Sequence, residues 1–360
     1  MNYNSRELLL IWLDSFIQLD YKQKYAIYSS VTEDLSVKKF LEDKKSEIIK
    51  SVGEQTFDAI YRSANKEYLQ TVLSELSKAD EKAITLESEY YPEMLKEIAD
   101  PPLVLYAKGN TELLKDEIFG IVGSRKSLPF SEALATEFAE DLISAGFTLI
   151  TGTAGGIDEK VLTAGIKSGK IISVSAGGLN CIYPAFHKEL LNDVAKHGLL
   201  ISERRENIAA QPYFFPIRNR IIAGLSVGVL AVNGRLKSGV ISTAEYCVDY
   251  GRDLFAVPYS PKTESGEGTN YLIKNGAMLC DSPKDILSYY GKESDEIAEN
   301  DLSDSEREII SSLKDGPLHI EKIAEAIGKA VFELTPTLTV LEIKGIIYKD
   351  GTNTYGLVRG

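Results

Sequence analysis

Apolar residues in the first 85 positions recur every three or four residues, which is the spacing of one face of an α-helix. The stretch holds a single glycine, Gly53, and no proline, so the usual punctuation between strands is absent. The periodic positions are Leu8, Ile11, Trp12, Phe16, Leu69, Val72, Leu73 and Leu76. The pattern predicts a small all-helical module over residues 1–85.

A different pattern begins at Ile118, where short apolar runs alternate with amphipathic segments. The runs are 119–122, 148–150, 171–175, 199–201, 227–232 and 253–257. The segments between them are 131–145, 160–168, 187–196, 219–224 and 243–250. Near-continuous apolar runs are typical of strands buried on both faces, and their alternation with helices predicts a doubly wound parallel α/β sheet. A further short strand is expected upstream, over 103–107.

The end of the chain changes pattern again. Residues 291–308 hold eight acidic residues, two basic residues and no aromatic residue, which is the composition of a solvated linker. Two helical patterns then precede a hairpin pattern with its turn at Asp350–Gly351, which is the layout of a winged helix. The predicted domains are a helical (SAM-like) module over 1–85, a doubly wound domain over 86–290, an acidic linker over 291–301 and a winged-helix domain over 302–360.

Composition narrows the possible functions. The 360 residues include 40 Lys and Arg against 53 Asp and Glu, a formal net charge of −13, which argues against coating nucleic acid by bulk charge. Residues 118–290 nevertheless contain 17 basic and 17 acidic residues, so the whole deficit lies in the flanks. A neutral central domain can still bind a strand through a few clustered arginines.

Cysteine and histidine usage indicates no metal site. The three cysteines lie far apart and the three histidines match no ligand spacing. No apolar run is long enough to span a bilayer, and the first residues do not form a secretory signal pattern. We therefore expect a soluble cytoplasmic protein with no membrane partner.

Glycine-bearing loops follow four of the predicted strands, at 123–126, 151–158, 176–179 and 233–239. In a parallel sheet such loops meet at one edge, glycines let a ligand approach the backbone, and helix N-termini aim N–H groups at anions. Arg125, Lys126, Arg235 and Lys237 add positive charge. The pattern predicts a phosphate-binding rim whose loops include Lys126, Gly152, Gly155, Ser238 and Gly239.

No cofactor and no catalytic residue are predicted at this rim. The glycines do not form the GxGxxG motif of dinucleotide-binding sites, and no acidic residue follows at the spacing that would bind the ribose 2′-OH. No P-loop motif occurs either. No Ser/His/Asp set is present. Asp158 and Glu245 are the carboxylates nearest the rim, and we expect Asp158 to cap the helix that begins after it.

A second group of residues runs from Gln211 to Arg220, where three consecutive aromatic residues precede an Arg-Asn-Arg triplet. Aromatic rings stack on bases and guanidinium groups bind phosphates, as in proteins that hold single strands. We expect Phe214 to lie in the core. Arg218 and Arg220 enter an apolar segment, so we expect each to have a partner.

The motifs follow one another in a characteristic order: Tyr91-Pro92, Asp100-Pro101-Pro102, Gly123-Ser124-Arg125, Gly152-x-Ala154-x-Gly156-Ile157-Asp158, Tyr183-Pro184, Phe215-Pro216-x-Arg218-Asn219-Arg220, Ser238-Gly239-x-x-x-Thr243-Ala244 and Gly251-Arg252-x-x-Phe255-Ala256-Val257-Pro258. In this order they resemble the DNA-processing protein A (DprA/Smf) family. The resemblance is strong over 90–290 and weaker over 302–357.

The resemblance implies an extended Rossmann-like domain that binds single-stranded DNA, forms a homodimer and is not an enzyme. It also implies that the protein helps to load the RecA recombinase onto incoming strands in natural transformation. The implied strand-binding pocket is lined by Ser124, Arg125, Arg218, Asn219, Arg220 and Lys237, with Phe215 beside it, and is shaped by Gly152, Gly156 and Asp158.

The sequence departs from the family's pattern at the rim, and two questions of function remain open. Gly155 stands where the family often has Arg or Lys, and we hypothesise that Arg204 and Arg205 restore that charge. The rival interpretation is a nucleotide-processing enzyme related to Rossmann-like phosphoribohydrolases, with Glu245 as the catalytic carboxylate. The FPIRNR segment has no role in such an enzyme. The candidate recognition helix over 334–343 contains no basic residue, so we expect the winged-helix domain to contact protein in preference to duplex DNA.

Overall fold

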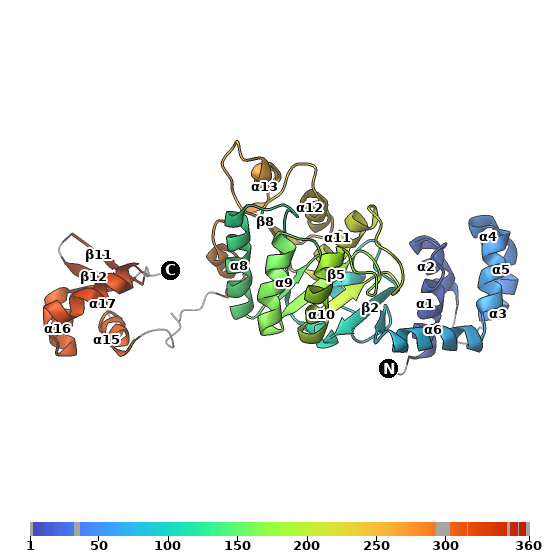
Figure 1. Cartoon of the computed structure of the whole chain (residues 1–360), viewed down its shortest axis with the longest axis horizontal. Helices are drawn as coiled ribbons and strands as arrows, with labels where there is room; N and C mark the ends of the chain where they lie inside the picture. Colours follow the sequence, from blue (N-terminus) through green and yellow to red (C-terminus); the bar gives the residue numbers. More distant parts are fainter. Residues whose placement is uncertain are drawn as a thin grey trace. The chain divides into compact units, whose positions relative to one another are not determined.

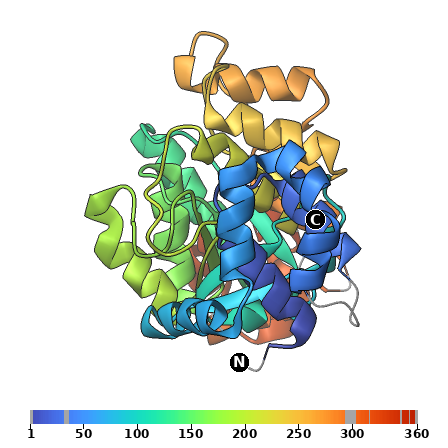
Figure 2. The same cartoon turned by 90° about the vertical axis from the view of Figure 1, so that its right-hand side faces the viewer.

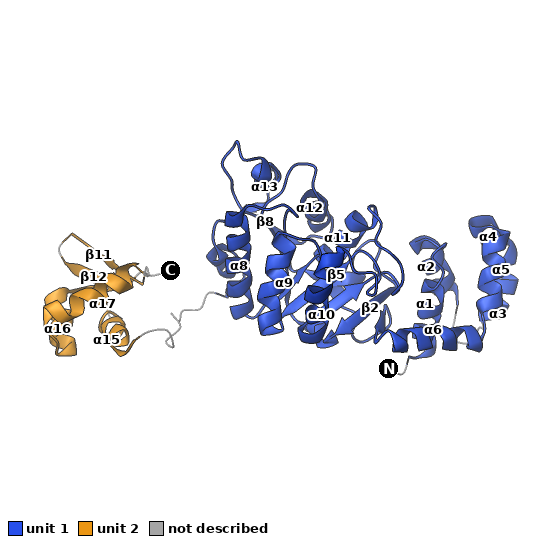
Figure 3. Cartoon of the chain, viewed as in Figure 1, with its two compact units in different colours: residues 1–292 blue, residues 293–360 orange. Residues whose placement is uncertain are grey.

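A computed structural model of the chain describes residues 3–31, 37–292, 303–314, 316–343, 346–351 and 353–357. The chain divides into two compact units, residues 1–292 and residues 293–360 (Figures 1 and 3). Apart from Gly291 and Lys292, the predicted acidic linker lies outside the described residues.

The first unit begins with α1 (Ser5–Asp14), α2 (Tyr21–Ser30), α3 (Val37–Asp43), α4 (Lys45–Val52), α5 (Glu54–Ser63) and α6 (Lys66–Lys78). The side chains of Asn4, Asp20 and Asn65 cap α1, α2 and α6 by accepting backbone N–H groups. These helices gather beside β2 at one end of the sheet (Figures 1 and 2). Trp12 and Tyr106 belong to one continuous apolar core, so the helical module and the sheet are packed together.

The end of the helical stretch corrects one prediction. Residues Lys82–Thr85 are not helical but form strand β1, which pairs antiparallel with β2 (Val104–Gly109). Helix α6 ends at Lys78, and Asp80 has a positive φ of 54° in the turn that follows. The strand has only four residues and follows a helix without Gly or Pro between them, so the sequence pattern did not reveal it.

The sheet has the strand order β1-β2-β6-β5-β4-β3-β7-β8-β9. Beyond β1 and β2 its strands are β3 (Ile118–Val122), β4 (Thr148–Thr151), β5 (Ile171–Ser175), β6 (Leu199–Ser202), β7 (Gly228–Ala231), β8 (Asp253–Ala256) and β9 (Met278–Leu279). Neighbours from β6 to β9 pair parallel, whereas β2 pairs antiparallel with both β1 and β6. Every residue of β3 to β7 is buried. The predicted parallel sheet, buried on both faces, is confirmed.

Helices cover both faces of this sheet (Figure 1). The helices of one face are α8 (Pro129–Ser144), α9 (Ile157–Ser168), α10 (Lys188–His197) and α14 (Pro283–Tyr289), and their apolar residues join the core of the helical module. Those of the other face are α7 (Glu93–Lys96), α11 (Phe214–Leu225), α12 (Gly239–Asp249) and α13 (Glu267–Lys274), which pack on a second apolar core. The sheet is therefore doubly wound.

The predicted helical segments are all helices, but four of them begin earlier than predicted: α8 by two residues, and α9, α11 and α12 by three to five. Helices α9, α11 and α12 start at Ile157, Phe214 and Gly239. Glycine, proline or polar residues in their first turns interrupt the apolar spacing on which the prediction depended. The difference matters because these first turns point at the rim.

The second unit is a winged helix, as predicted. Its elements are α15 (Asp304–Ser312), β10 (Leu318–His319), α16 (Ile320–Ile327), α17 (Val331–Ile343), β11 (Ile347–Lys349) and β12 (Thr354–Leu357). The three strands pair antiparallel in the order β10-β12-β11. Helix α17 contains two glutamates and no basic residue, and it exposes the apolar side chains of Phe332 and Ile343.

Candidate nucleic-acid interface

The loops after β3, β4, β5 and β7 share one edge of the sheet, because these strands run parallel. Two contacts join the loops into one rim. The backbone N–H of Ser124 donates to Asn233 Oδ1 over 2.8 Å, and the N–H of Ile157 donates to the carbonyl of Ser124 over 3.4 Å. Ser124 thus joins the loop after β3 to the loops after β4 and β7.

Arg218 lies beneath this rim. Arg218 is only 7% exposed. Its Nη1 donates to the carbonyl of Val174 in β5, and its Nε donates to Asn219 Oδ1 over 3.1 Å. A Cβ atom at Gly152 would lie 2.7 Å from Arg218 Nη2. The guanidinium therefore occupies the space that Gly152 leaves empty, which explains why a glycine ends β4 here.

Asp158 faces the same space from α9. It is buried, and it accepts the N–H of Ala154 over 3.1 Å. Burial raises the pKa of Asp158 and the positive charge of Arg218 opposes that rise, whereas burial lowers the pKa of Arg218 to about 10. The prediction that Asp158 precedes and caps its helix is wrong, since α9 starts at Ile157 with Gly156 as its N-cap. Asp158 instead holds the 154–158 turn against Arg218.

Arg125 and Phe215 form the exposed part of the site. The Arg125 guanidinium lies over the Phe215 ring, with Cζ 4.6 Å from the ring centroid, and the ring of Tyr183 meets Phe215 edge-on at 5.6 Å. Arg125 and Tyr183 are exposed, and Phe215 is partly exposed. The first turn of α11 therefore presents an aromatic surface beside a cation.

Asn219 connects α11 to the start of α12. Its Nδ2 donates to the carbonyl of Gly239 and to Ser242 Oγ, both over 3.1 Å. Ser238 stands at the N-cap of α12, and its hydroxyl donates to the carbonyl of Arg235 over 2.7 Å. Asn219 is buried and shapes the site, while the backbone N–H groups at the start of α12 are positioned to meet an anion.

Three exposed cations of the rim carry no opposing charge. In the described part of the chain, the side chains of Arg125, Lys126 and Lys237 take part in no ion pair and no hydrogen bond, and Lys126 bonds to the Ser124 hydroxyl through its backbone only. Arg235 differs, because it pairs with Glu264 over 2.5 Å. The three unpaired side chains are available to phosphates.

Arg220 does not belong to the rim, and this corrects its predicted place in the pocket. It is 3% exposed, its Nε donates to Asp100 Oδ2 over 3.0 Å, and its Nη2 donates to Glu203 Oε1 over 2.6 Å. These carboxylates raise the pKa of Arg220, against the effect of burial. The expectation that this arginine has partners is confirmed, and its role is to lock α11 to the lead-in segment.

The two remaining glycines behave differently. Gly156 has a φ of 72°, and a Cβ there would collide with the carbonyl of Ser124. Gly155 has nothing within 3.8 Å of a Cβ position, and its nearest neighbour is the carbonyl of Arg125. The site has room for a long side chain at position 155, where the charge is missing.

Sequence reasoning missed two residues of the site. Asn233 is fully buried and bridges two loops, and its only sequence signal was its place directly after an apolar run. Phe214 was expected in the core but is only partly buried, with the Arg204 guanidinium 4.5 Å from its ring centroid. Arg204 and Arg218 line one small cavity together, whereas Arg205 pairs with Glu75.

The fold and the rim together define a doubly wound protein of the Rossmann-like class, with a basic, aromatic-bearing edge in place of a nucleotide-cofactor motif. A family model for DNA recombination-mediator protein A matches residues 82–291, and one for the DprA winged helix domain matches residues 293–348. The chain therefore belongs to the DprA/Smf family of DNA-processing proteins.

Similar proteins cover most of the chain. The DNA processing protein DprA of Bacillus subtilis is 39% identical over 221 residues, which are 61% of this chain and 74% of that protein. Protein Smf of Escherichia coli is 31% identical over 305 residues, 80% of each chain. The structure resembles DprA of Streptococcus pneumoniae, with a TM-score of 0.65 and 27% identity over 80% of this chain and 98% of that one.

A second similar structure is DNA processing protein A of Helicobacter pylori, described for its single-stranded DNA binding mode. It has a TM-score of 0.54 and 28% identity, and the match covers 59% of this chain and 96% of that one. Among the described residues of the present chain, no helix is long and apolar enough to cross a membrane. No group of three or more His, Cys, Asp or Glu side chains in the same residues is placed to hold a metal ion.

Proposed function

We propose that this protein binds single-stranded DNA along the rim, without reading its sequence. The observation that carries the proposal is the exposed Arg125–Phe215 pair, which offers a phosphate-binding cation and a base-stacking ring within one contact. Lys126 and Lys237 supply further unpaired charge on either side of the sheet's switch point. Arg218, Asp158 and Asn219 hold the loops in place beneath.

The aromatic residues favour a single strand over a duplex. Tyr213 is 62% exposed, Tyr183 49% and Phe186 77%, and all three belong to segments that follow β5 or lead into α11. Bases stack on such rings only when they are unpaired, since a duplex already buries their faces. The neutral central domain supplies too few cations to hold a duplex by charge alone.

The cellular role we propose follows the family. In this role the protein, as a cytoplasmic homodimer, protects incoming single strands and helps to load the RecA recombinase in natural transformation or homologous recombination. Support comes from the similarity to the proteins named DNA processing protein DprA in Bacillus subtilis and Streptococcus pneumoniae. We propose that the protein binds DNA and does not catalyse a reaction. Glu245 is exposed, and among the described residues no hydrogen bond or ion pair joins its carboxylate to a residue of the rim.

Fluorescence anisotropy with a labelled 30-residue oligo(dT) and the matching duplex, over a series of salt concentrations, tests this function. Arg125→Ala should weaken strand binding about tenfold and reduce the slope of log K against log salt by about 0.7, the contribution of one phosphate contact. Lys167→Ala is the matched control, because Lys167 is an exposed cation in the last turn of α9, at the far end from the rim. Equal slopes for the two variants would overturn the assignment.

A further inference from the structure

Two consecutive arginines in the segment between β6 and α11 have different partners. Arg204 lies over the Phe214 ring and lines the small cavity that has Arg218 in its wall. The Arg205 Nη2 is 2.8 Å from Glu75 Oε2 on α6. One peptide bond therefore separates a side chain of the candidate DNA site from a side chain bound to the helical module.

The Arg205–Glu75 ion pair is more buried on the arginine side than on the glutamate side. The Arg205 side chain is 18% exposed and that of Glu75 is 47% exposed. The backbone around Arg205 packs on the loop after β5. The N–H of Gly178 donates to the carbonyl of Ile208 over 2.8 Å, and the N–H of Asn180 donates to the carbonyl of Glu206 over 3.1 Å. A Cβ at Gly178 would collide with the Arg205 carbonyl, so the two loops lie in close contact.

A second set of polar contacts reaches the same segment from the start of β1. Lys108 Nζ donates to Asn180 Oδ1 over 2.8 Å and lies 3.7 Å from Glu81 Oε1. Asn180 Nδ2 donates to Glu206 Oε2 over 3.2 Å. Glu81 has a fully buried side chain and directly precedes β1. The segment that carries Arg204 is thus bound to the helical module through Arg205 and to the sheet edge through Glu206.

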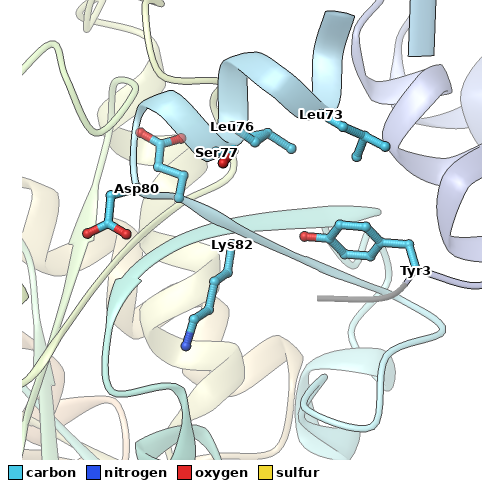
Figure 4. A pocket seen from close by; sticks show the side chains of 7 residues that line it. Tyr3, Leu73, Leu76, Ser77, Asp80 and Lys82 are labelled. Carbon is cyan, nitrogen blue, oxygen red and sulfur yellow. The ribbon is translucent and has the colours of Figure 1, made fainter. Parts of the chain in front are cut away.

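The surface is hollowed where α6 approaches the sheet edge. A cavity of about 330 Å³ lies there, lined by Tyr3, Leu73, Leu76, Ser77, Asp80, Glu81 and Lys82. Figure 4 shows Leu73, Leu76 and Ser77 entering it from α6 and Lys82 from the strand below. The ion pair from Glu75 to Arg205 supplies part of the contact between this end of α6 and the rest of the unit.

We propose that the helical module positions the DNA site: Glu75 holds Arg205, and this keeps Arg204 on Phe214 at the mouth of the Arg218 cavity. The inference rests on the proposed function and adds Arg204 to the strand-binding residues. Glu75 is a positioning residue and has no contact with DNA of its own. It also gives the N-terminal module, which has 14 acidic and 12 basic residues, a role in DNA binding that its charge alone would not suggest.

The test uses the full chain and the labelled oligo(dT) in anisotropy titrations. Removing an acidic residue generally strengthens DNA binding by relieving repulsion, and Glu67→Ala measures that effect, because Glu67 is exposed on the same helix. Glu75→Ala should instead weaken binding about threefold or more relative to Glu67→Ala. Arg204→Ala should weaken it about five- to tenfold.

The double variant separates positioning from charge. If Glu75 acts through Arg204, the variant Glu75→Ala/Arg204→Ala binds no more weakly than Arg204→Ala alone. The swapped pair Glu75→Arg/Arg205→Glu should restore binding to within about twofold of the wild type, which a general loss of folding would not allow. Additive effects, or Glu75→Ala binding as tightly as Glu67→Ala, would overturn the proposal.

Failure of the underlying function has a different signature. If the wild-type chain does not bind the oligonucleotide, or Arg125→Ala binds like Lys167→Ala, the strand-binding function is wrong and the positioning role falls with it. If Arg125→Ala weakens binding while the Glu75 variants match their control, only the positioning role is wrong.

Discussion

The Arg125 guanidinium and the Phe215 ring lie 4.6 Å apart although 90 positions separate them in the chain. One extends from the loop after β3 and the other from the first turn of α11. The contact exists because β3 and β6 run in the same direction through β4 and β5, so the loop after β3 and the segment that leads from β6 into α11 leave the sheet at one edge. A cation and a stacking surface are thereby brought together, and each supports the other's orientation.

Removing the ring should weaken strand binding more than duplex binding. Phe215→Ala removes one stacking face and the support for Arg125, so we expect a loss of about 1–3 kcal/mol for oligo(dT). Phe332→Ala, which removes another exposed aromatic ring on the winged-helix unit, is the control and should change neither affinity. Anisotropy titrations with both oligonucleotides measure the difference, and equal losses for strand and duplex would contradict base stacking.

Adding an arginine at position 155 should strengthen binding. A Cβ atom there meets nothing closer than 3.8 Å, so Gly155→Arg can extend from the rim without displacing backbone. We expect affinity for oligo(dT) to rise about fivefold and the salt slope to steepen by about 0.7. Gly155→Ala separates the effect of charge from that of the backbone, and an equal gain in both variants would show that charge is not the cause.

Arg220 should matter for stability in preference to DNA binding. Arg220→Met removes the cation that Asp100 and Glu203 share and leaves Glu203 only Arg204, 3.8 Å away. We expect a loss of about 2–3 kcal/mol in the free energy of unfolding, less than for a fully buried pair because Asp100 is half-exposed. Lys196→Ala breaks the exposed pair with Asp193 and should cost under about 1 kcal/mol. Urea denaturation compares them. If the folded Arg220→Met variant bound oligo(dT) with a changed slope of log K against log salt, Arg220 would have to be counted among the DNA-binding residues.

Glu81 should make stability depend on pH near neutrality. Burial raises the pKa of Glu81 to about 7, against the opposing charge of Lys108. Between about pH 4.5 and 7 the folded state therefore binds more protons than the unfolded state, and stability falls as pH rises through that window. Glu81→Gln should raise the free energy of unfolding by about 1–2 kcal/mol at pH 8 and by little at pH 5.

The exposed Glu67 on α6 provides the comparison for that measurement. Glu67→Gln should leave thermal unfolding unchanged at both pH values, because its carboxylate faces water. A Glu81→Gln gain that is equal at pH 5 and pH 8 would mean that the carboxylate of Glu81 is not what titrates.

The central sheet was predictable because of burial. Strands such as β3 and β5 are covered on both faces, so nearly every position is apolar and the run stands out in the sequence. The four-residue strand β1 was not predictable, since it lies at the sheet edge directly after a helix and its partners in β2 are 19 to 25 positions away. Its place depends on tertiary contacts that no local pattern records.

The rim was predicted as a set of loops, while the roles of its arginines were only partly predicted. Arg218 and Arg220 are two positions apart on α11, about 200° around the helix axis, so they cannot face the same ligand. The sequence prediction nevertheless placed both in the pocket, because the partner that identifies the one outside it, Asp100, lies 120 positions upstream of Arg220. Long-range ion pairs of this kind are beyond a reading of motifs.

The missing side chain at Gly152 has an evolutionary consequence. A Cβ there would lie 2.7 Å from Arg218 Nη2 and closer still to Asp158 Oδ2, so any single substitution conflicts with both partners at once. Change at this position is tolerable only when Arg218 and Asp158 change as well. We expect these three positions to be inherited together, as one unit of variation, in chains that keep this site.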